Sequence, residues 1–427
     1  MSEVSPDLTQ PNTRRAYRLG IANGILFAFG AAFVDPVTVL PTFVSRLTES
    51  EFVVGLVSAI GMSGWFLPQL VAANYLQARP YKRPLYIVSA TFRGAGWLLS
   101  IPLVCLLAPR HPLAALVAFL ICYSFSSFGG GFSGPAFLDI VAKTIPPKRL
   151  GSFFGHRQFW GGLGAILCGL LVRHILAADS LAFPNNYCLL FGLALAFFAP
   201  GWAAFTFIKE PPGRVTEAQP FVTFMLNAPS VIRRHRDYRL LLISRLFLGA
   251  SGIALPFYII YCRRFLGISE AGVGTYLSLQ MAGSVVFIPL WTYLNDRKGP
   301  HQLLIATAVL SLTAPVLAFI AAFSPQAVSL GRVGFGLVFF SLAAVGAGSF
   351  IGFTNYLFAI APEEKRPLYI GVQNTLYAVT TLMPPLGGLL VASTSFRVLF
   401  GLAAVFSLAG AVTILRLPHG VRGESEG

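Results

Sequence analysis

Asp35 is the only acidic side chain well inside an apolar stretch of this sequence, so it is the first candidate for chemistry. It lies about 17 residues beyond Arg18, which is roughly 25 Å along a helix. A carboxylate deep in an apolar layer costs free energy unless it is paired, protonated or reached by water. The position therefore predicts a proton or substrate site, or alternatively a structural cap or ion pair near the end of its helix.

Arg245 enters another apolar stretch about one and a half turns beyond a basic flank. A guanidinium that faces a cavity can hold a carboxylate or phosphate in its planar fork. Alternatively, the side chain extends to the nearby polar surface or pairs with an acid in a loop. In continuous helices, Arg245 would share a face with Gly249, Gly252 and Pro256, and Asp35 would share one with Gly24, Ala28, Ala31, Thr38 and Thr42.

Several amide and aromatic side chains in apolar stretches could also contact a ligand. The candidates are Gln69, Gln280, Asn355, Gln373, Asn374, Tyr377 and Trp160. Each amide could equally satisfy a neighbouring backbone group, and an aromatic ring in such a stretch can simply pack against its neighbours. Both interpretations are kept open.

The elements that carry these residues are long apolar helices. Hydrophobic residues make up 55% of the 427 residues and charged residues only 11%, with a mean hydropathy of +0.71. Soluble domains carry about 25% charged residues, and about 20 apolar residues cross a bilayer as a helix. We predict an all-α polytopic membrane protein with twelve spans, at about 19–44, 53–77, 84–108, 112–141, 153–177, 187–209, 240–264, 271–294, 301–323, 330–360, 367–392 and 395–417.

The chain also repeats itself. Tyr75-Leu76-Gln77-Ala78-Arg79 resembles Tyr293-Leu294-Asn295-Asp296-Arg297, which lies 218 residues later. Gly169-Leu170-Leu171-Val172 resembles Gly388-Leu389-Leu390-Val391, which lies 219 residues later. Such self-similarity indicates duplicated structural units. We therefore predict two pseudo-symmetric six-helix bundles, at 1–209 and 240–427, joined by a cytoplasmic central loop at 210–239.

The net charge of +15 is unevenly distributed between the loops. Basic residues concentrate before the first span, in the even-numbered gaps and in the central loop, as in Arg14, Arg79, Lys143, Arg234 and Arg297. This asymmetry is the positive-inside pattern and predicts both termini in the cytoplasm. The charge therefore indicates contact with anionic lipid heads, and we expect no nucleic-acid partner.

The repeated loop motif and the two six-span halves resemble the major facilitator superfamily over essentially the whole chain. The loop signature of that family is G-x-x-x-D-R-x-G-x-R-R. The second copy keeps Asp296, Arg297 and Gly299, with Thr292 in place of the first glycine. The first copy keeps Arg79 and Arg83, but Ala78 replaces the acid and Tyr81 the glycine.

The resemblance implies a transporter that works by alternating access around a site near the bilayer midplane. It implies gating roles at the cytoplasmic loops for Arg79, Arg83, Asp296, Arg297 and Gly299. Asp139, whose counterpart in the second half is Asn355, is expected in the same charge network near Lys143. The resemblance also implies that the first, fourth, seventh and tenth spans line the substrate site.

Other functional classes lack their residues. There is no G-x-x-x-x-G-K-[ST] phosphate loop and no His/Glu or His/Asp cluster within a span, so we expect no enzyme and no cofactor or metal. The five cysteines lack metal-ligand spacing and are expected to pack as small apolar residues.

We therefore predict a monomeric secondary active transporter, with protons as the coupling ion through Asp35 and a small organic molecule as the substrate. It would lie in contact with lipid in a bacterial inner membrane. The alternatives are an uncoupled facilitative carrier, and a transporter-like assembly factor or sensor without transport.

The topology is directly testable. Reporter fusions at Gly213 and Gly420 should both report the cytoplasm, and a fusion at Pro109 should report the opposite side, because the basic loops stay inside. A periplasmic signal at either terminus would contradict the assignment.

Overall fold

The computed structural model describes residues 11–213, 232, 235–323, 328–362 and 366–418, and these residues form helices and no strands. The first half of the chain contains α1 (Pro11–Phe33), α2 (Val39–Val44), α3 (Glu51–Gln77), α4 (Arg83–Leu107), α5 (Pro112–Thr144), α6 (Pro147–Ala177) and α7 (Asn185–Thr206). The second half contains α9 (Arg236–Ala250), the 3-10 helix η1 (Ser251–Ala254), α10 (Leu255–Phe265), α11 (Glu270–Ser311), α12 (Thr313–Phe323), α13 (Val328–Ile360), α14 (Arg366–Thr380), α15 (Met383–Ser393) and α16 (Phe396–Leu415).

Among the described residues, eleven helical stretches are long and apolar enough to cross a membrane. One of them, Glu270–Phe323, has 54 residues and includes the predicted spans 271–294 and 301–323. Within it, Gly299 has a φ of +83°, which breaks the helical backbone in a conformation that favours glycine. The coarse prediction of an all-helical membrane protein is confirmed, while the number of twelve spans stays a prediction.

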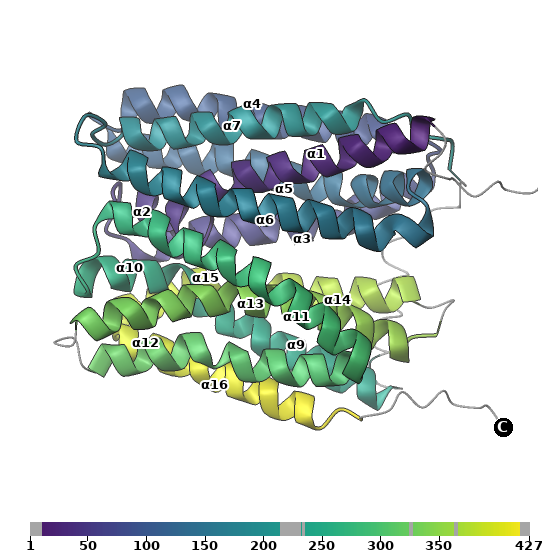
Figure 1. Cartoon of the computed structure of the whole chain (residues 1–427). Helices are drawn as coiled ribbons and strands as arrows, with labels where there is room; N and C mark the ends of the chain where they lie inside the picture. Colours follow the sequence, from purple (N-terminus) through teal and green to yellow (C-terminus); the bar gives the residue numbers. More distant parts are fainter. Residues whose placement is uncertain (1–10, 214–231, 233–234, 324–327, 363–365, 419–427) are drawn as a thin grey trace, which may run out of the picture. The chain divides into compact units, whose positions relative to one another are not determined.

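The helices form two compact units. Unit 1 comprises residues 1–49, 60–219 and 270–278, and unit 2 comprises residues 50–59, 220–269 and 279–427. Figure 1 shows that the long helices within each unit run roughly alongside one another. Short stretches of α3 and α11 are grouped with the other half of the sequence, and the predicted domain bounds stay a prediction. Most of the predicted central loop lies outside the described residues.

Each unit has its own buried core. In unit 1, one cluster joins α1, α3, α4, α5, α6 and α7 through side chains such as Tyr86, Phe153 and Phe205. In unit 2, a cluster around Tyr238, Phe353 and Tyr369 joins α9, α11, α13, α14 and α16. Many large apolar side chains remain exposed, for example Leu106, Val333 and Phe350. An apolar outer surface of this kind suits contact with lipid tails, which offer no hydrogen-bond partners.

Three predicted spans are interrupted, which corrects the predicted helical faces. The helix of the first span ends at Phe33, and the next helix begins at Val39. Asp35 and Thr38 lie between the two helices, so they do not share the helical face that was predicted for them. The seventh passes through η1, so the face of Arg245 ends near Gly249. The eleventh breaks between Thr380 and Met383. Proline directly follows Asp35 and Met383, and proline weakens the hydrogen-bond ladder of a helix.

The cysteine prediction was partly wrong. Cys105, near the end of α4, forms a disulfide with Cys188, near the start of α7, while Cys122, Cys168 and Cys262 are buried thiols. The two bonded residues are 83 positions apart, so their spacing in the sequence gave no sign of the pairing.

Close helix approach in unit 1 depends on missing side chains. A Cβ at Gly131 of α5 would overlap the carbonyl oxygen of Gly64 in α3 and would come within 2.7 Å of Pro68 Cδ. At Gly155 of α6, by contrast, a Cβ would meet nothing within 4 Å. The α3–α5 contact is therefore a backbone-to-backbone approach that only glycine permits at residue 131.

We expect Gly131→Ala to destabilise the protein by about 1–3 kcal/mol, because backbone atoms must separate to admit the methyl group. Gly155→Ala is the matched control, since both substitutions gain the same helix propensity of up to about 1 kcal/mol. Thermal unfolding of the purified proteins should show a lower melting temperature for Gly131→Ala only. Equal melting temperatures would mean that this approach does not limit stability.

Candidate functional site

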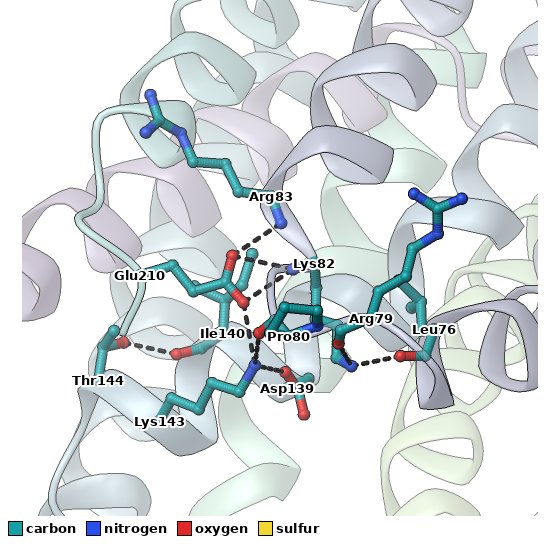
Figure 2. A network of polar contacts seen from close by, with 10 residues as sticks. All are labelled: Leu76, Arg79, Pro80, Lys82, Arg83, Asp139, Ile140, Lys143, Thr144 and Glu210. Atoms are coloured by element: carbon teal, nitrogen blue, oxygen red, sulfur yellow. Dashed lines mark hydrogen bonds and ion pairs between the residues drawn. The ribbon is translucent and has the colours of Figure 1, made fainter. Parts of the chain in front are cut away.

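A carboxylate that the sequence analysis did not single out organises the loop between α3 and α4. Glu210 follows α7, and its side chain is only 2% exposed. Its carboxylate oxygens accept hydrogen bonds from the backbone N–H of Lys82 (2.8 and 3.0 Å) and of Arg83 (2.8 Å). Figure 2 shows this carboxylate between the first turn of α4 and the Lys143 ammonium. Glu210 therefore caps a helix that begins 127 residues earlier.

Two lysines complete this network. Lys143 Nζ lies 3.0 Å from Glu210 Oε1 and 2.5 Å from Asp139 Oδ2, and it donates to the carbonyl oxygen of Pro80. Lys82 is buried, and its ammonium donates to the carbonyl oxygens of Leu76 and Arg79. Burial lowers the pKa of Lys82 below its ordinary value, against the opposing effect of the Asp139 carboxylate. Every charge in the network thus has a partner.

The predicted gating arginines take part in this network only through their backbones. Arg83 contributes its N–H and Arg79 its carbonyl oxygen. Their guanidinium groups point away from Glu210 (Figure 2), and that of Arg79 stacks on the ring of Tyr75 at 4.2 Å. Asp139 lies where the sequence analysis expected it, beside Lys143.

The second copy of the loop is built differently. Asp296 Oδ1 accepts a hydrogen bond from the neighbouring Asn295 side chain, whose oxygen in turn accepts one from Asn355 Nδ2 at 3.1 Å. The guanidinium of Arg297 lies 5.9 Å from the Tyr293 ring centroid. Gly299 forms the break in α11. The structure therefore places Asn355, a candidate for substrate binding, against Asn295, the neighbour of the gating candidate Asp296.

In unit 2, Arg245 of α9 faces α14. Its guanidinium lies 4.7 Å from the ring centroid of Tyr377 and 5.4 Å from that of Phe353. Gly249, one turn further, lets the helices approach, since a Cβ there would be 2.9 Å from Thr380 Cβ. Among the described residues, no carboxylate lies within ion-pair distance of Arg245 and none accepts a hydrogen bond from it. The residue as a whole is partly exposed.

Gln373 and Asn374 lie one turn before Tyr377 on α14. Gln373 is 3% exposed, and its Oε1 finds no hydrogen-bond donor among the described residues. Because Gln373 and Tyr377 are four residues apart, they share the helical face on which Arg245 stacks. The candidates Arg245, Gln373 and Tyr377 are thus brought together, with Asn374 adjacent.

The other binding candidates are not part of this group. Gln280 is buried in α11. Gln69 of α3 packs beside Gly134 of α5, where a Cβ would lie 3.5 Å from its Nε2. Trp160 of α6 is 49% exposed and meets Phe159 edge to face. Both Gln69 and Trp160 belong to unit 1.

Asp35 lies in the turn between α1 and α2 and is 6% exposed. Its Oδ1 accepts hydrogen bonds from the backbone N–H of Val37 (2.9 Å) and of Thr38 (2.8 Å), and from the Thr38 hydroxyl (2.8 Å). Asp35 therefore holds together the turn that precedes α2, which is a structural role. These contacts leave its coupling role as a prediction.

Two further arginines lie within the helices of unit 1. Arg157 of α6 donates through Nη1 to Gly20 O at 2.6 Å and Asn23 Oδ1 at 3.0 Å, and Gly24 makes room for its guanidinium. Arg93 of α4 donates to Ser133 Oγ at 3.2 Å and stacks on Trp202 at 4.4 Å. Among the described residues, neither guanidinium has a carboxylate within ion-pair distance, and no three His, Cys, Asp or Glu side chains could hold a metal ion.

Comparison with known protein families gives a match over the second half of the chain. Residues 240–427 match the family model described as the Major Facilitator Superfamily. The second half of the chain is therefore similar to this family, in line with the resemblance of the repeated loop. No curated protein matches the sequence.

Solved transporter structures share the fold over nearly the whole chain. A single-residue variant of the nucleoside transporter NupG has a TM-score of 0.69 at 15% identity, covering 94% of this chain and 99% of its own. A D-xylose-proton symporter has 0.68 at 16%, covering 97% and 99%. A bacterial homologue of the iron transporter ferroportin, in an inward-facing state, has 0.71 at 15%, covering 95% and 98%.

Proposed function

We propose that this protein is a secondary active transporter that moves a small organic solute with an anionic group by alternating access. The family and the fold support transport in general. The cargoes named for the similar structures, a nucleoside, D-xylose and iron, are chemically unlike one another and do not choose a substrate for this chain. The substrate class rests instead on Arg245.

Arg245 is the single observation that carries the substrate class. Its guanidinium stacks on Tyr377 and Phe353, and each such cation–π contact contributes about 0.5–2 kcal/mol. Stacking holds the plane of the guanidinium but leaves its five N–H donors at the edge. A carboxylate or phosphate accepts two of these donors at once and neutralises the charge. Gln373 on the same face could add a hydrogen bond to the bound group.

Two ion pairs support the proposed alternating access, and each involves the start of a helix from the other half of the sequence. Within unit 1, Arg46 pairs with Glu270 at the start of α11, at 3.4 Å. Within unit 2, Arg264 pairs with Glu51 at the start of α3. Each helix start comes from the opposite half of the sequence, so relative motion of the two halves would have to break both pairs. In each pair the arginine is partly exposed while the carboxylate is more deeply placed.

We propose protons as the coupling ion and Asp35 as their site, with uncoupled facilitated transport as the alternative. We further propose twelve spans, a bacterial inner membrane, cytoplasmic termini and a monomer. The 54 residues of Glu270–Phe323 support two crossings there, because a helix of that length would extend about 80 Å.

Transport itself is tested by flux into liposomes. Purified protein is reconstituted, and uptake of a mixture of small organic acids is followed by mass spectrometry against protein-free liposomes. The proposal predicts protein-dependent accumulation of at least one acid under an imposed proton gradient. An assembly factor or sensor would give no flux for any compound.

We expect Arg245→Lys to weaken binding of the transported acid by about 10–100-fold, because lysine cannot present the two-pronged donor edge. The amount of protein in the membrane should not change. Arg239→Lys, an exposed arginine on the same helix, is the matched control and should bind normally. Intact binding in Arg245→Ala would show that the side chain serves the membrane surface instead.

We expect Asp35→Asn to abolish accumulation driven by a proton gradient, since asparagine cannot exchange a proton. Exchange of the substrate across the membrane without a gradient should continue. Measuring both modes in the same proteoliposomes separates coupling from folding. If accumulation is unchanged, Asp35 has a structural role only.

A further inference from the structure

The first copy of the repeated loop lacks the acidic residue that the second copy carries, although it keeps the arginine that follows. Ala78 stands where the second copy has Asp296, and it is exposed at the end of α3. Conversely, α5 of the first half has Asp139 where the second half has Asn355. The two copies thus distribute their negative charge differently around the same loop.

Glu210 brings a carboxylate to this loop from outside the repeated motif. It accepts the two backbone N–H groups at the start of α4 and receives the Lys143 ammonium, so three donors converge on one nearly buried side chain. Figure 2 shows the Glu210 carboxylate beside Pro80 and Lys82, at the start of α4. A carboxylate at a helix N-terminus is stabilised by the positive end of the helix dipole.

The same segment is attached to the loop at a second point. The N–H of Gly213 donates to the carbonyl oxygen of Pro80 at 2.8 Å, and Lys143 Nζ donates to that same oxygen. Residues 210–213 therefore lie against residues 80–83 through both backbone and side chain. They are the start of the segment that connects the two halves of the sequence.

We propose that Glu210 supplies the acid that the loop at residues 78–83 lacks, and that it acts as a positioning residue which holds this loop and the start of the connecting segment as one body. Any movement of the loop during transport then displaces residues 210–213 with it. The inference concerns how the loop is held and does not depend on the chemistry of the substrate.

The charges that face Glu210 are consistent with this role. Lys143 is shared between Glu210 and Asp139, and the Lys82 ammonium turns to backbone carbonyls of the loop. Removing the Glu210 charge would leave Asp139 as the only carboxylate ion-paired with Lys143 among the described residues. It would also leave two N–H groups at the start of α4 without their acceptor, and such groups are costly when shielded from water.

Hydrogen exchange of the loop amides tests the proposal without any substrate. Because Pro80 and Pro84 have no amide hydrogen, a peptide over residues 79–84 reports Tyr81, Lys82 and Arg83. In Glu210→Gln, exchange in this peptide should accelerate about tenfold or more, since hydrogen bonds to a charged acceptor are the stronger ones. Asp179→Asn, which removes an acid from the other end of the helices in the same unit, is the matched control and should leave the peptide unchanged.

Rescue distinguishes a replaced acid from a merely structural contact. The double variant Glu210→Gln with Ala78→Asp places an acid at the position that carries it in the second copy. The exchange rate of the 79–84 peptide should then return to within about twofold of the wild type, because a nearby carboxylate again accepts the charge-assisted hydrogen bonds. If Glu210→Gln alone does not accumulate in the membrane, the double variant must do so. Unchanged exchange in Glu210→Gln, or no rescue by Ala78→Asp, would overturn the proposal.

Discussion

The cost of an unneutralised charge among apolar helices is the constraint on which this structure depends. The protein has few charged side chains, and it concentrates most of them in loops and at helix ends, where water or a partner is near. In the loop network of unit 1, each buried charge has a defined partner, with Glu210 between two backbone amides and Lys143. This network can therefore be stable without any ligand.

The arginines within the helices are stabilised by other contacts than ion pairs. Arg93, Arg157 and Arg245 are held by aromatic rings, hydroxyl groups or carbonyl oxygens, and none has an ion-pair partner among the described residues. Arg157 fills a space made by Gly24, and Arg93 is buried against Trp202, so both are fixed within unit 1. Arg245 differs because it makes no hydrogen bond to any described residue, which is why we assign the anionic group of the substrate to it.

The sequence was sufficient to predict the helical membrane fold and a break between residues 294 and 301, where Gly299 interrupts the helical backbone. Long apolar stretches and a repeated loop are local signals, and they survive in one sequence. It could not predict the interruptions at Asp35 and η1, because an apolar stretch reads the same whether its helix is continuous or broken. The exchange of short stretches of α3 and α11 between units is likewise a property of packing alone. The roles assigned to the candidate site residues stay predictions. Arg245 contacts Tyr377 and Asn355 contacts Asn295, and neither contact could be predicted from the spacing of these residues in the sequence. Glu210 was missed because its partners lie 67 and 127 residues away, although an isolated acid directly after the sixth span was a usable signal.

The most direct test of the central claim is a melting-shift screen of the purified protein against pairs of small organic acids and their neutral amides. A ligand of the native state raises its melting temperature, so each pair compares charge at nearly constant shape. Our account predicts that some acids stabilise the wild type, that their amides do not, and that Arg245→Gln loses the shift. Equal stabilisation by amides, or a full shift in Arg245→Gln, would contradict the claim that Arg245 binds an anionic substrate.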